Sequence, residues 1–213
     1  MNQILIYSDS LTWGIIPNTR NRLVFEKRWP GVLEASLNRK DKNVRVIENC
    51  LNGRRTAWND PFKEGRDGSQ GLAQVIEMHS PLKLVILMLG SNDFQNSHDN
   101  NAWYSAQGMA KLIQIIRQAP IEPGMPVPEI MIIAPPPITE PKGEMIEKFS
   151  GAEKRCIGLA SELEKIAGQF SVLFFNAGDV IEASVVDGIH LDENQHKQLG
   201  EEVAQAILNC SKL

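Results

Sequence analysis

The sequence predicts an α/β fold: a three-layer αβα sandwich around a doubly wound, five-stranded parallel sheet in the flavodoxin-like strand order 2-1-3-4-5. Short apolar segments alternate with longer segments of helical periodicity along all 213 residues. The apolar segments are continuous rather than alternating, as in strands buried on both faces. Polar turns follow several of them. We expect a single domain spanning residues 1–213.

The individual elements follow from this pattern. Strands are expected at residues 4–7, 44–50, 82–89, 129–134 and 172–176. Helices are expected at residues 28–39, 71–78, 101–118, 151–168 and from a capping-box-like start at Asp192 and Gln195 through Asn209. Residues 57–70 and 138–150 are polar, rich in Gly or Pro, and are expected to form long loops.

Composition argues against several classes of partner. The 22 basic and 26 acidic residues are interspersed and give a net charge of −4, so no basic surface for nucleic acid or anionic lipid is expected. No stretch approaches 18 apolar residues, and the first residues lack the features of a signal peptide. We expect a cytoplasmic protein that binds neither nucleic acid nor membrane.

The cysteines and histidines do not predict a metal site. Cys50, Cys156 and Cys210 are scattered and include no C-x-x-C pair, which argues against a disulfide framework or a thiolate site. The four histidines show no metal-binding spacing. We therefore expect no metal and no cofactor.

Reactive side chains follow the strands of the predicted sheet. Ser10 follows the first strand, Gly53 the second, Asn92 the third, and Asp187 and His190 the fifth. Because the carboxyl ends of parallel strands share one edge of a sheet, these groups should face one crevice. A serine hydroxyl needs an adjacent base, which imidazole supplies, and a carboxylate orients the imidazole. The sequence thus predicts a catalytic triad of Ser10, His190 and Asp187.

The remaining groups match the needs of a tetrahedral oxyanion. The backbone N–H groups of Ser10 and Gly53 and the side-chain amide of Asn92 are expected to form an oxyanion hole. Each residue also has a simpler explanation, because Ser, Asp, Asn and Gly are common at helix caps and turns. A binding module for flavin or nucleotide phosphate on the turn from Ser8 to Thr12 is the non-enzymatic alternative, although the sequence has no Gly-rich phosphate motif.

Four motifs together resemble those of the GDSL, or SGNH, hydrolase family over essentially the whole chain. They are Ser8-Asp9-Ser10-Leu11, Asn52-Gly53, Gly90-Ser91-Asn92-Asp93 and Asp187-Gly188-Ile189-His190. Within the family, residues 9–14, 28–33 and 52–54 look most similar to small bacterial arylesterases and acyltransferases. The resemblance implies the same triad and oxyanion hole, short-chain acyl (acetyl-type) ester substrates and a possible homo-oligomer. Ser8 replaces the family's first glycine.

The substrate is less constrained than the chemistry. Apolar residues close to the catalytic turns are expected to line a crowded acyl pocket, namely Leu11, Trp13, Ile15, Phe94 and Ile189. An arylesterase-like serine esterase is the first expectation, with a carbohydrate acetylesterase as the alternative and a lysophospholipase or thioesterase as the third.

Overall fold

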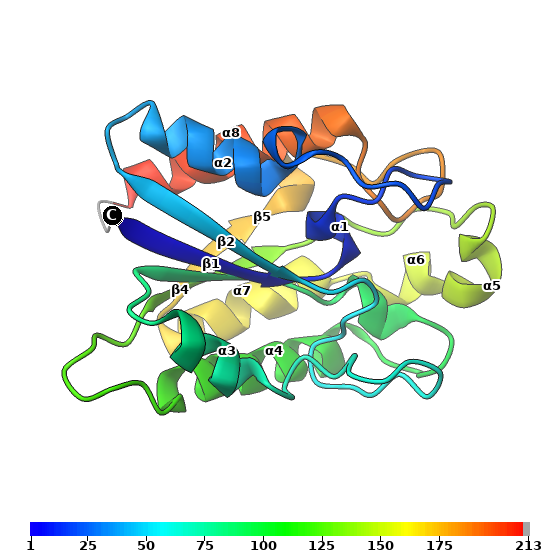
Figure 1. Ribbon diagram of the computed structural model, residues 1–213. Helices are drawn as coiled ribbons and strands as arrows, with labels where there is room; N and C mark the ends of the chain where they lie inside the picture. Colours follow the sequence, from blue (N-terminus) through cyan, green and yellow to red (C-terminus); the bar gives the residue numbers. More distant parts are fainter. Residues whose placement is uncertain (211–213) are drawn as a thin grey trace.

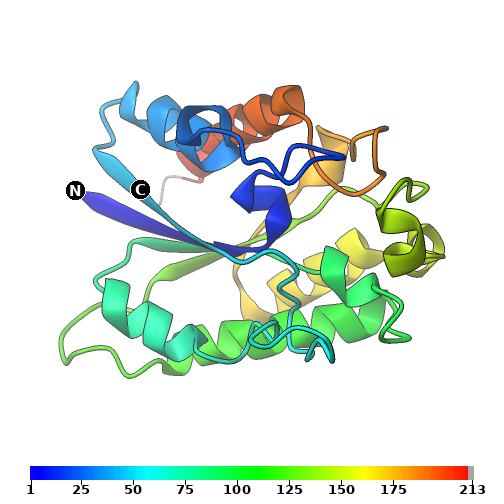
Figure 2. The same ribbon diagram turned by 45° about the vertical axis from the view of Figure 1, so that its right-hand side comes forward.

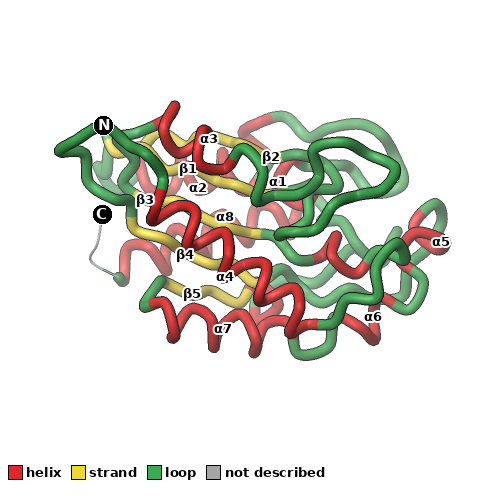
Figure 3. The backbone as a smooth tube through the Cα atoms, turned by 90° about the horizontal axis from the view of Figure 1, so that it is seen from below, coloured by secondary structure: helices red, strands yellow, loops and turns green. Residues whose placement is uncertain are grey.

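The computed structural model describes residues 1–210 and contains one five-stranded sheet (Figure 1). All pairings are parallel and the order is β2-β1-β3-β4-β5, which confirms the predicted topology. Figure 3 shows the five strands side by side. Their bounds are β1 Asn2–Ser8, β2 Val44–Cys50, β3 Leu84–Met88, β4 Glu129–Ala134 and β5 Leu173–Asn176.

Helices cover both faces of the sheet. In Figure 1, α2 (Trp29–Asn38) and α8 (Glu193–Asn209) lie above it, whereas α3 (Leu72–His79), α4 (Ala102–Gln118) and α7 (Leu159–Phe170) lie below it. Short helices lie in the connections: α1 Ser10–Trp13, η1 Phe25–Lys27, η2 Ser91–Phe94, α5 Met145–Phe149, α6 Ala152–Arg155 and η3 Ala177–Asp179. This is the expected three-layer sandwich.

Side-chain alternation along β1 explains why its central residues, 4–7, are all buried and largely apolar. Ile4 and Ile6 are fully buried with α2 and α8, in a cluster that includes Trp29 of α2. Leu5 and Tyr7 point to the opposite face and pack in the cluster formed with α3, α4 and α7. Both faces of a parallel sheet are covered, so every position of such a strand is core.

Strand register brings the turns that carry the predicted site residues to one edge of the sheet. Ser8, the last residue of β1, pairs with Cys50 of β2 and with Met88 of β3. The turns that follow these three strands therefore start at the same level of the sheet. In Figure 2, the loops that follow β1 (dark blue) and β2 (cyan) extend away from the N-terminus. The sheet edge is thus the scaffold of the candidate site.

The connection after β4 differs from expectation. A single helix over residues 151–168 is wrong, because Gly158 adopts a left-handed φ of +87° and separates α6 from α7. The loop predicted at residues 138–150 contains the short helix α5. Asp192 is the N-cap of α8, but its side chain makes no capping hydrogen bond and instead accepts one from Ser184 Oγ at 2.9 Å.

None of the helices within residues 1–210 combines the length and the hydrophobicity needed to span a membrane. The long segment at residues 57–70 contains no helix or strand, as expected, and connects β2 to α3 across the sheet edge.

The packing of α8 against α2 buries a histidine whose protonation should control stability. Nδ1 of His196 accepts a hydrogen bond from the Trp29 N–H at 3.3 Å, and the side chain is fully buried. Burial, with smaller effects of the Arg28 and His190 charges, lowers the pKa of His196 to about 3. The unfolded chain binds this proton near pH 6.5, so the free energy of unfolding should fall as the pH drops below 6.5.

We predict that His196→Asn weakens this pH dependence, because it removes the titration and keeps an acceptor near the position of Nδ1. Between pH 7.5 and pH 5, the wild type should lose roughly 2 kcal/mol more unfolding free energy than the variant. Urea unfolding at the two pH values measures both losses. Equal losses would contradict a histidine that is buried in its neutral form.

Candidate active site

Ser10 lies where β1 turns into α1. Asp9 is the N-cap of this short helix, and its Oδ1 accepts a hydrogen bond from the Leu11 N–H at 2.9 Å. Ser10 is the first residue of the helix, where a backbone N–H has no intrahelical partner. Its hydroxyl faces His190, with Nε2 and Oγ 3.2 Å apart. The cap is therefore Asp9, which leaves the Ser10 side chain available.

Ser8 has a separate role. Its hydroxyl is fully buried, donates to the Met88 carbonyl oxygen at 2.6 Å and accepts from Thr12 Oγ1 at 2.6 Å. Thr12 Oγ1 in turn accepts from Trp29 Nε1 at 3.1 Å. This chain of hydrogen bonds joins β1, β3, α1 and α2. The residue that departs from the family pattern thus braces the turn and does not line the pocket at Ser10.

Asp187 and His190 lie in one tight turn before α8. Oδ1 of Asp187 accepts from the N–H groups of Ile189 and His190, at 3.0 and 2.9 Å. Oδ2 lies 2.7 Å from His190 Nδ1. The turn uses one carboxylate oxygen to hold its own backbone and the other to orient the imidazole. Asp187, His190 and Ser10 therefore form a continuous hydrogen-bonded chain across 180 residues of sequence.

The carboxyl group of Asp187 stays ionised at neutral pH. Burial acts to raise its pKa, but hydrogen bonding to His190, the His190 charge and the two backbone N–H groups outweigh burial and lower it. An ionised Asp187 accepts a hydrogen bond and favours the imidazole tautomer that carries its proton on Nδ1. Nε2 then presents a lone pair toward Ser10 Oγ. The geometry suits a general base next to a hydroxyl.

Gly53 lies in the turn after β2 and lines the same pocket as Ser10. Its φ is +84°, in the left-handed region where a side chain is strained. Among the described residues, no acceptor is bonded to the Gly53 N–H. Arg54 fixes this turn on β1, because its guanidinium donates to the Ser8 carbonyl oxygen at 2.9 Å and stacks 3.8 Å above the Tyr7 ring.

The side-chain amide of Asn92 is fixed from both ends. Its Nδ2 donates to Asp9 Oδ2 at 2.8 Å, and its Oδ1 accepts from Gln95 Nε2 at 2.6 Å. Because an amide nitrogen carries two protons, one N–H remains for a ligand. Asn92 is buried and lines the pocket with Ser10, Gly53 and His190. The structure thus brings the predicted oxyanion donors together with the Ser-His-Asp chain.

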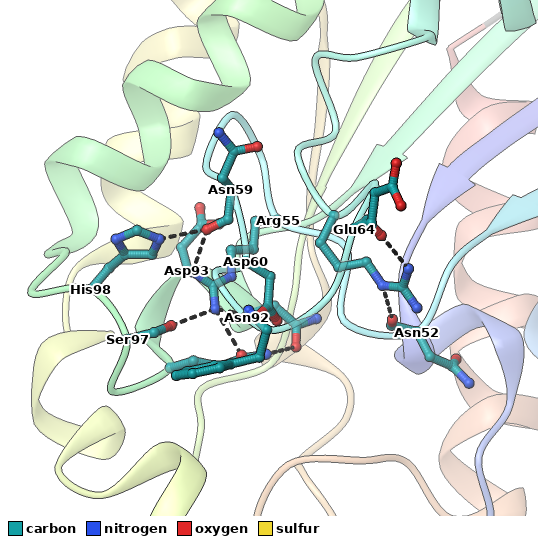
Figure 4. A network of polar contacts seen from close by, with 12 residues as sticks. Asn52, Arg55, Asn59, Asp60, Glu64, Asn92, Asp93, Ser97 and His98 are labelled. Carbon is teal, nitrogen blue, oxygen red and sulfur yellow. Dashed lines mark hydrogen bonds and ion pairs between the residues drawn. The ribbon is translucent and has the colours of Figure 1, made fainter.

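The polar network continues from Asn92 into the loop that follows β2 (Figure 4). Arg55 is fully buried, donates to Gln95 Oε1 at 2.9 Å and to Ser97 Oγ at 2.6 Å, and lies 3.6 Å from Asp60 Oδ2. Arg55 therefore supports Asn92 through the amide of Gln95.

Asp93 anchors the same loop beside Asn92. Its carboxylate accepts hydrogen bonds from Thr56 N–H, Thr56 Oγ1 and Ser105 Oγ at 2.9, 2.7 and 2.6 Å. Burial raises the pKa of Asp93 to about 6, although these hydrogen bonds oppose the shift. The carboxylate links the loop to α4 through Ser105.

The pocket in front of Ser10 is small, about 40 Å³. Ile15 is the predicted acyl-pocket residue that lines it. Met145 and Phe149 of α5 add apolar surface, and Arg20, Lys63 and Lys148 add basic side chains. These five lining residues were not anticipated from the sequence, because they come from loops and from α5 rather than from the catalytic turns.

The expected apolar mouth needs correction, because the other residues named for it lie elsewhere. Leu11 is in the core below α2, since the helical turn of α1 directs it away from Ser10. Trp13 packs against Arg22, whose guanidinium carbon lies 4.7 Å from the centroid of the Trp13 ring. Ile189 is in the core on the face of α4 and α7. Phe94 belongs to that core and lines a separate apolar cavity of about 260 Å³ between η2 and α7.

Two sets of positioning residues were also missed. Asp9 lies inside the first motif, directly before Ser10. This position beside the proposed nucleophile is the sequence signal that could have identified it as a positioning residue. Arg55 and Gln95 carry no signal in the sequence, since their contact depends on how residues 54–67 fold over η2. No group of three or more His, Cys, Asp or Glu side chains within residues 1–210 is arranged to hold a metal ion.

Solved structures similar to this one include bacterial esterases. Est24, a carbohydrate acetylesterase from Sinorhizobium meliloti, is 32% identical with a TM-score of 0.92, and the match covers 99% of this chain and 100% of that chain. The inhibitor-bound aryl esterase of M. smegmatis is 31% identical with a TM-score of 0.93, covering 98% of this chain and 99% of that one. No curated protein sequence matches significantly.

The family assignment rests on a match that spans most of the sequence. Residues 9–198 match the model of the GDSL-like Lipase/Acylhydrolase family, which covers all the turns described above. Both structural neighbours, at 32% and 31% identity, are named as esterases. The chain belongs to the GDSL-like lipase/acylhydrolase family and is a carboxylic ester hydrolase.

Proposed function

We propose that this hydrolase is an arylesterase-like serine esterase that cleaves short-chain acyl esters, with Ser10 as nucleophile, His190 as general base and Asp187 as the residue that orients it. The single observation that carries the proposal is the position of His190, with Nε2 3.2 Å from Ser10 Oγ and Nδ1 2.7 Å from Asp187 Oδ2. The family assignment and the two esterase neighbours support it.

The first half-reaction forms an acyl-enzyme. Ser10 Oγ attacks the carbonyl carbon while His190 Nε2 takes the hydroxyl proton. The oxyanion accepts hydrogen bonds from the N–H groups of Ser10 and Gly53 and from Asn92 Nδ2. The bond to the leaving oxygen then breaks, and His190 returns the proton to that oxygen. An alcohol leaves, and the acyl group stays on Ser10.

The second half-reaction regenerates the enzyme with the same groups. His190 removes a proton from a water molecule, whose oxygen attacks the acyl carbon, and the same oxyanion hole stabilises the second tetrahedral intermediate. Oγ of Ser10 leaves and recovers its proton from His190. The products are a carboxylic acid and free Ser10. Asp187 remains ionised throughout and stabilises the imidazolium that forms in each step.

Carbohydrate acetylesterase is the second candidate, because Est24 is as similar to this chain as the aryl esterase is. The two candidates share the catalytic chemistry and differ in the leaving group. Comparing kcat/KM on phenyl acetate with kcat/KM on acetylated sugars decides between them. A higher value on the sugars would replace the arylesterase proposal without changing the residues that carry the reaction.

Ser10→Ala should reduce esterase activity to the background rate, whereas Ser8→Gly should keep turnover. Only Ser10 presents its hydroxyl to His190, while the Ser8 hydroxyl is used in buried hydrogen bonds. Rates on a chromogenic acetate ester are measured for both variants, and the residue labelled by a phosphonate is mapped by mass spectrometry. A label on Ser8 would refute the assignment. Ser8→Gly should unfold at a lower temperature than the wild type, because Thr12 Oγ1 loses its acceptor.

Asn92→Ala should lower kcat by about 10² to 10³, which is the usual contribution of one oxyanion-hole donor. The exposed Asn194 of α8 supplies a matched control, since it does not line the pocket of Ser10. Steady-state kinetics on phenyl acetate should show Asn194→Ala near the wild type. A loss confined to KM in Asn92→Ala would instead identify a residue that binds substrate and transition state equally.

Activity should decrease with acyl length from acetyl and propionyl toward octanoyl esters. Each buried methylene would gain about 0.8 kcal/mol, but a pocket of about 40 Å³ bounded by Ile15 has little room for them. Ile15→Ala should move the optimum to longer chains, and Trp13→Phe, outside the pocket lining, should not. Values of kcat/KM on an aryl ester series give the result. A wild-type optimum at eight carbons would favour a lysophospholipase or thioesterase.

A further inference from the structure

Basic side chains converge on the pocket of Ser10 from three separate segments. Arg20 comes from the loop after α1, Lys63 from the loop after β2, and Lys148 from α5. No carboxylate is among the residues that line this pocket. The whole chain carries a net charge of −4, so the pocket concentrates charge of the opposite sign. Such a concentration needs a physical explanation.

The three basic groups have no acidic partner among residues 1–210. None of them forms an ion pair or a side-chain hydrogen bond there, and the only specific contact is Lys148 Nζ lying 5.7 Å from the Phe149 ring. Asp60, whose charge acts on Lys148, lies 3.6 Å from Arg55. Lys63 and Lys148 also line a neighbouring hollow, which contains Asp60, Glu144 and Glu147, but none of these three acids lines the pocket of Ser10.

Lys148 experiences this charge most directly. It is half-buried, and burial lowers its pKa, with Lys63, Arg55 and Arg20 lowering it further while Asp60 opposes the shift. Like charges gathered beside a half-buried ammonium destabilise the unliganded protein. A bound anion would relieve this repulsion, and a cleft of one sign also attracts ligands of the other sign from solution.

We propose that the esterase prefers esters whose leaving group carries a negatively charged substituent, either a carboxylate or a phosphate. Arg20, Lys63 and Lys148 bind this substituent. This inference rests on the proposed function, in which Ser10 accepts only short acyl groups. An acetyl group has no place for a charge, so the charge must be on the alcohol side. The three cations determine specificity and take no part in bond making or bond breaking.

The test is a series of acetate esters that differ in charge. The substrates are 4-acetoxybenzoate, 4-acetoxyphenyl phosphate, neutral methyl 4-acetoxybenzoate and cationic 4-acetoxyphenyltrimethylammonium. Each kcat/KM is divided by the rate constant for imidazole-catalysed hydrolysis of the same ester, because imidazole is a neutral nucleophile and corrects for intrinsic reactivity without adding a charge effect of its own. We expect the normalised kcat/KM to be highest for the anionic esters, lower for the neutral ester and lowest for the cationic ester. These differences should shrink at high salt, because ions screen exposed charges. The two anionic esters separate a carboxylate from a phosphate preference.

The variants identify the source of the preference. An exposed charge pair contributes up to about fivefold. Each of Arg20→Gln, Lys63→Gln and Lys148→Gln should therefore lower the anionic-to-neutral ratio by about two- to fivefold, and the triple variant by about eightfold or more. Lys111→Gln is the matched control, since Lys111 is exposed on α4 and does not line the pocket. Activity on the neutral ester shows that each variant is folded.

Two results would overturn the inference: a wild-type ratio near one for both anions, or a ratio that the triple variant leaves unchanged. Both results differ from failure of the proposed function. If the proposed function were wrong, the wild type would not hydrolyse the neutral ester, or Ser10→Ala would hydrolyse it as fast as the wild type.

Discussion

The hydrogen bond from Asn92 Nδ2 to Asp9 Oδ2 joins the turn after β3 to the turn after β1, and the site depends on it. Burial raises the pKa of Asp9 to about 6, while the Leu11 N–H and Asn92 oppose that shift by stabilising the carboxylate. The same carboxylate caps the helix that begins with Ser10. One buried carboxylate therefore holds both the turn that carries Ser10, the proposed nucleophile, and the amide of Asn92, the proposed oxyanion donor.

The loop after β2 extends this constraint beyond the sheet. Arg55 contacts Gln95, which fixes the Asn92 amide, and Thr56 donates twice to Asp93. These groups are buried, and Arg55 and Asp93 are charged, so leaving any of them without its hydrogen-bond partner would be costly. Residues 51–71 lack regular secondary structure, yet this network ties them to η2 and α4. Hydrogen bonds hold this loop in place, whereas apolar packing holds the helices on the sheet.

Sequence reasoning succeeded where the sheet alone determines position. The strand order and the turns carrying Ser10, Gly53, Asn92 and His190 follow from continuous apolar strands, because parallel strands end at one edge. It failed where a side chain's direction depends on one or two dihedral angles. Leu11 follows Ser10 directly but points into the core, because α1 begins at Ser10 rather than later. Gly158 in a left-handed conformation divided a segment of otherwise helical periodicity.

The pocket lining was inaccessible to sequence reasoning for a different reason. Arg20, Lys63 and Lys148 are 43 and 85 residues apart, and no periodicity relates them. They meet because the loop after α1, the loop after β2 and α5 all lie over the same sheet edge, where the strand register brings the catalytic turns together. Under the proposed function, the sheet positions the groups that cleave the ester bond, and the three overlying segments select the rest of the ester. These segments lie outside the turns that carry Ser10, His190 and Asp187.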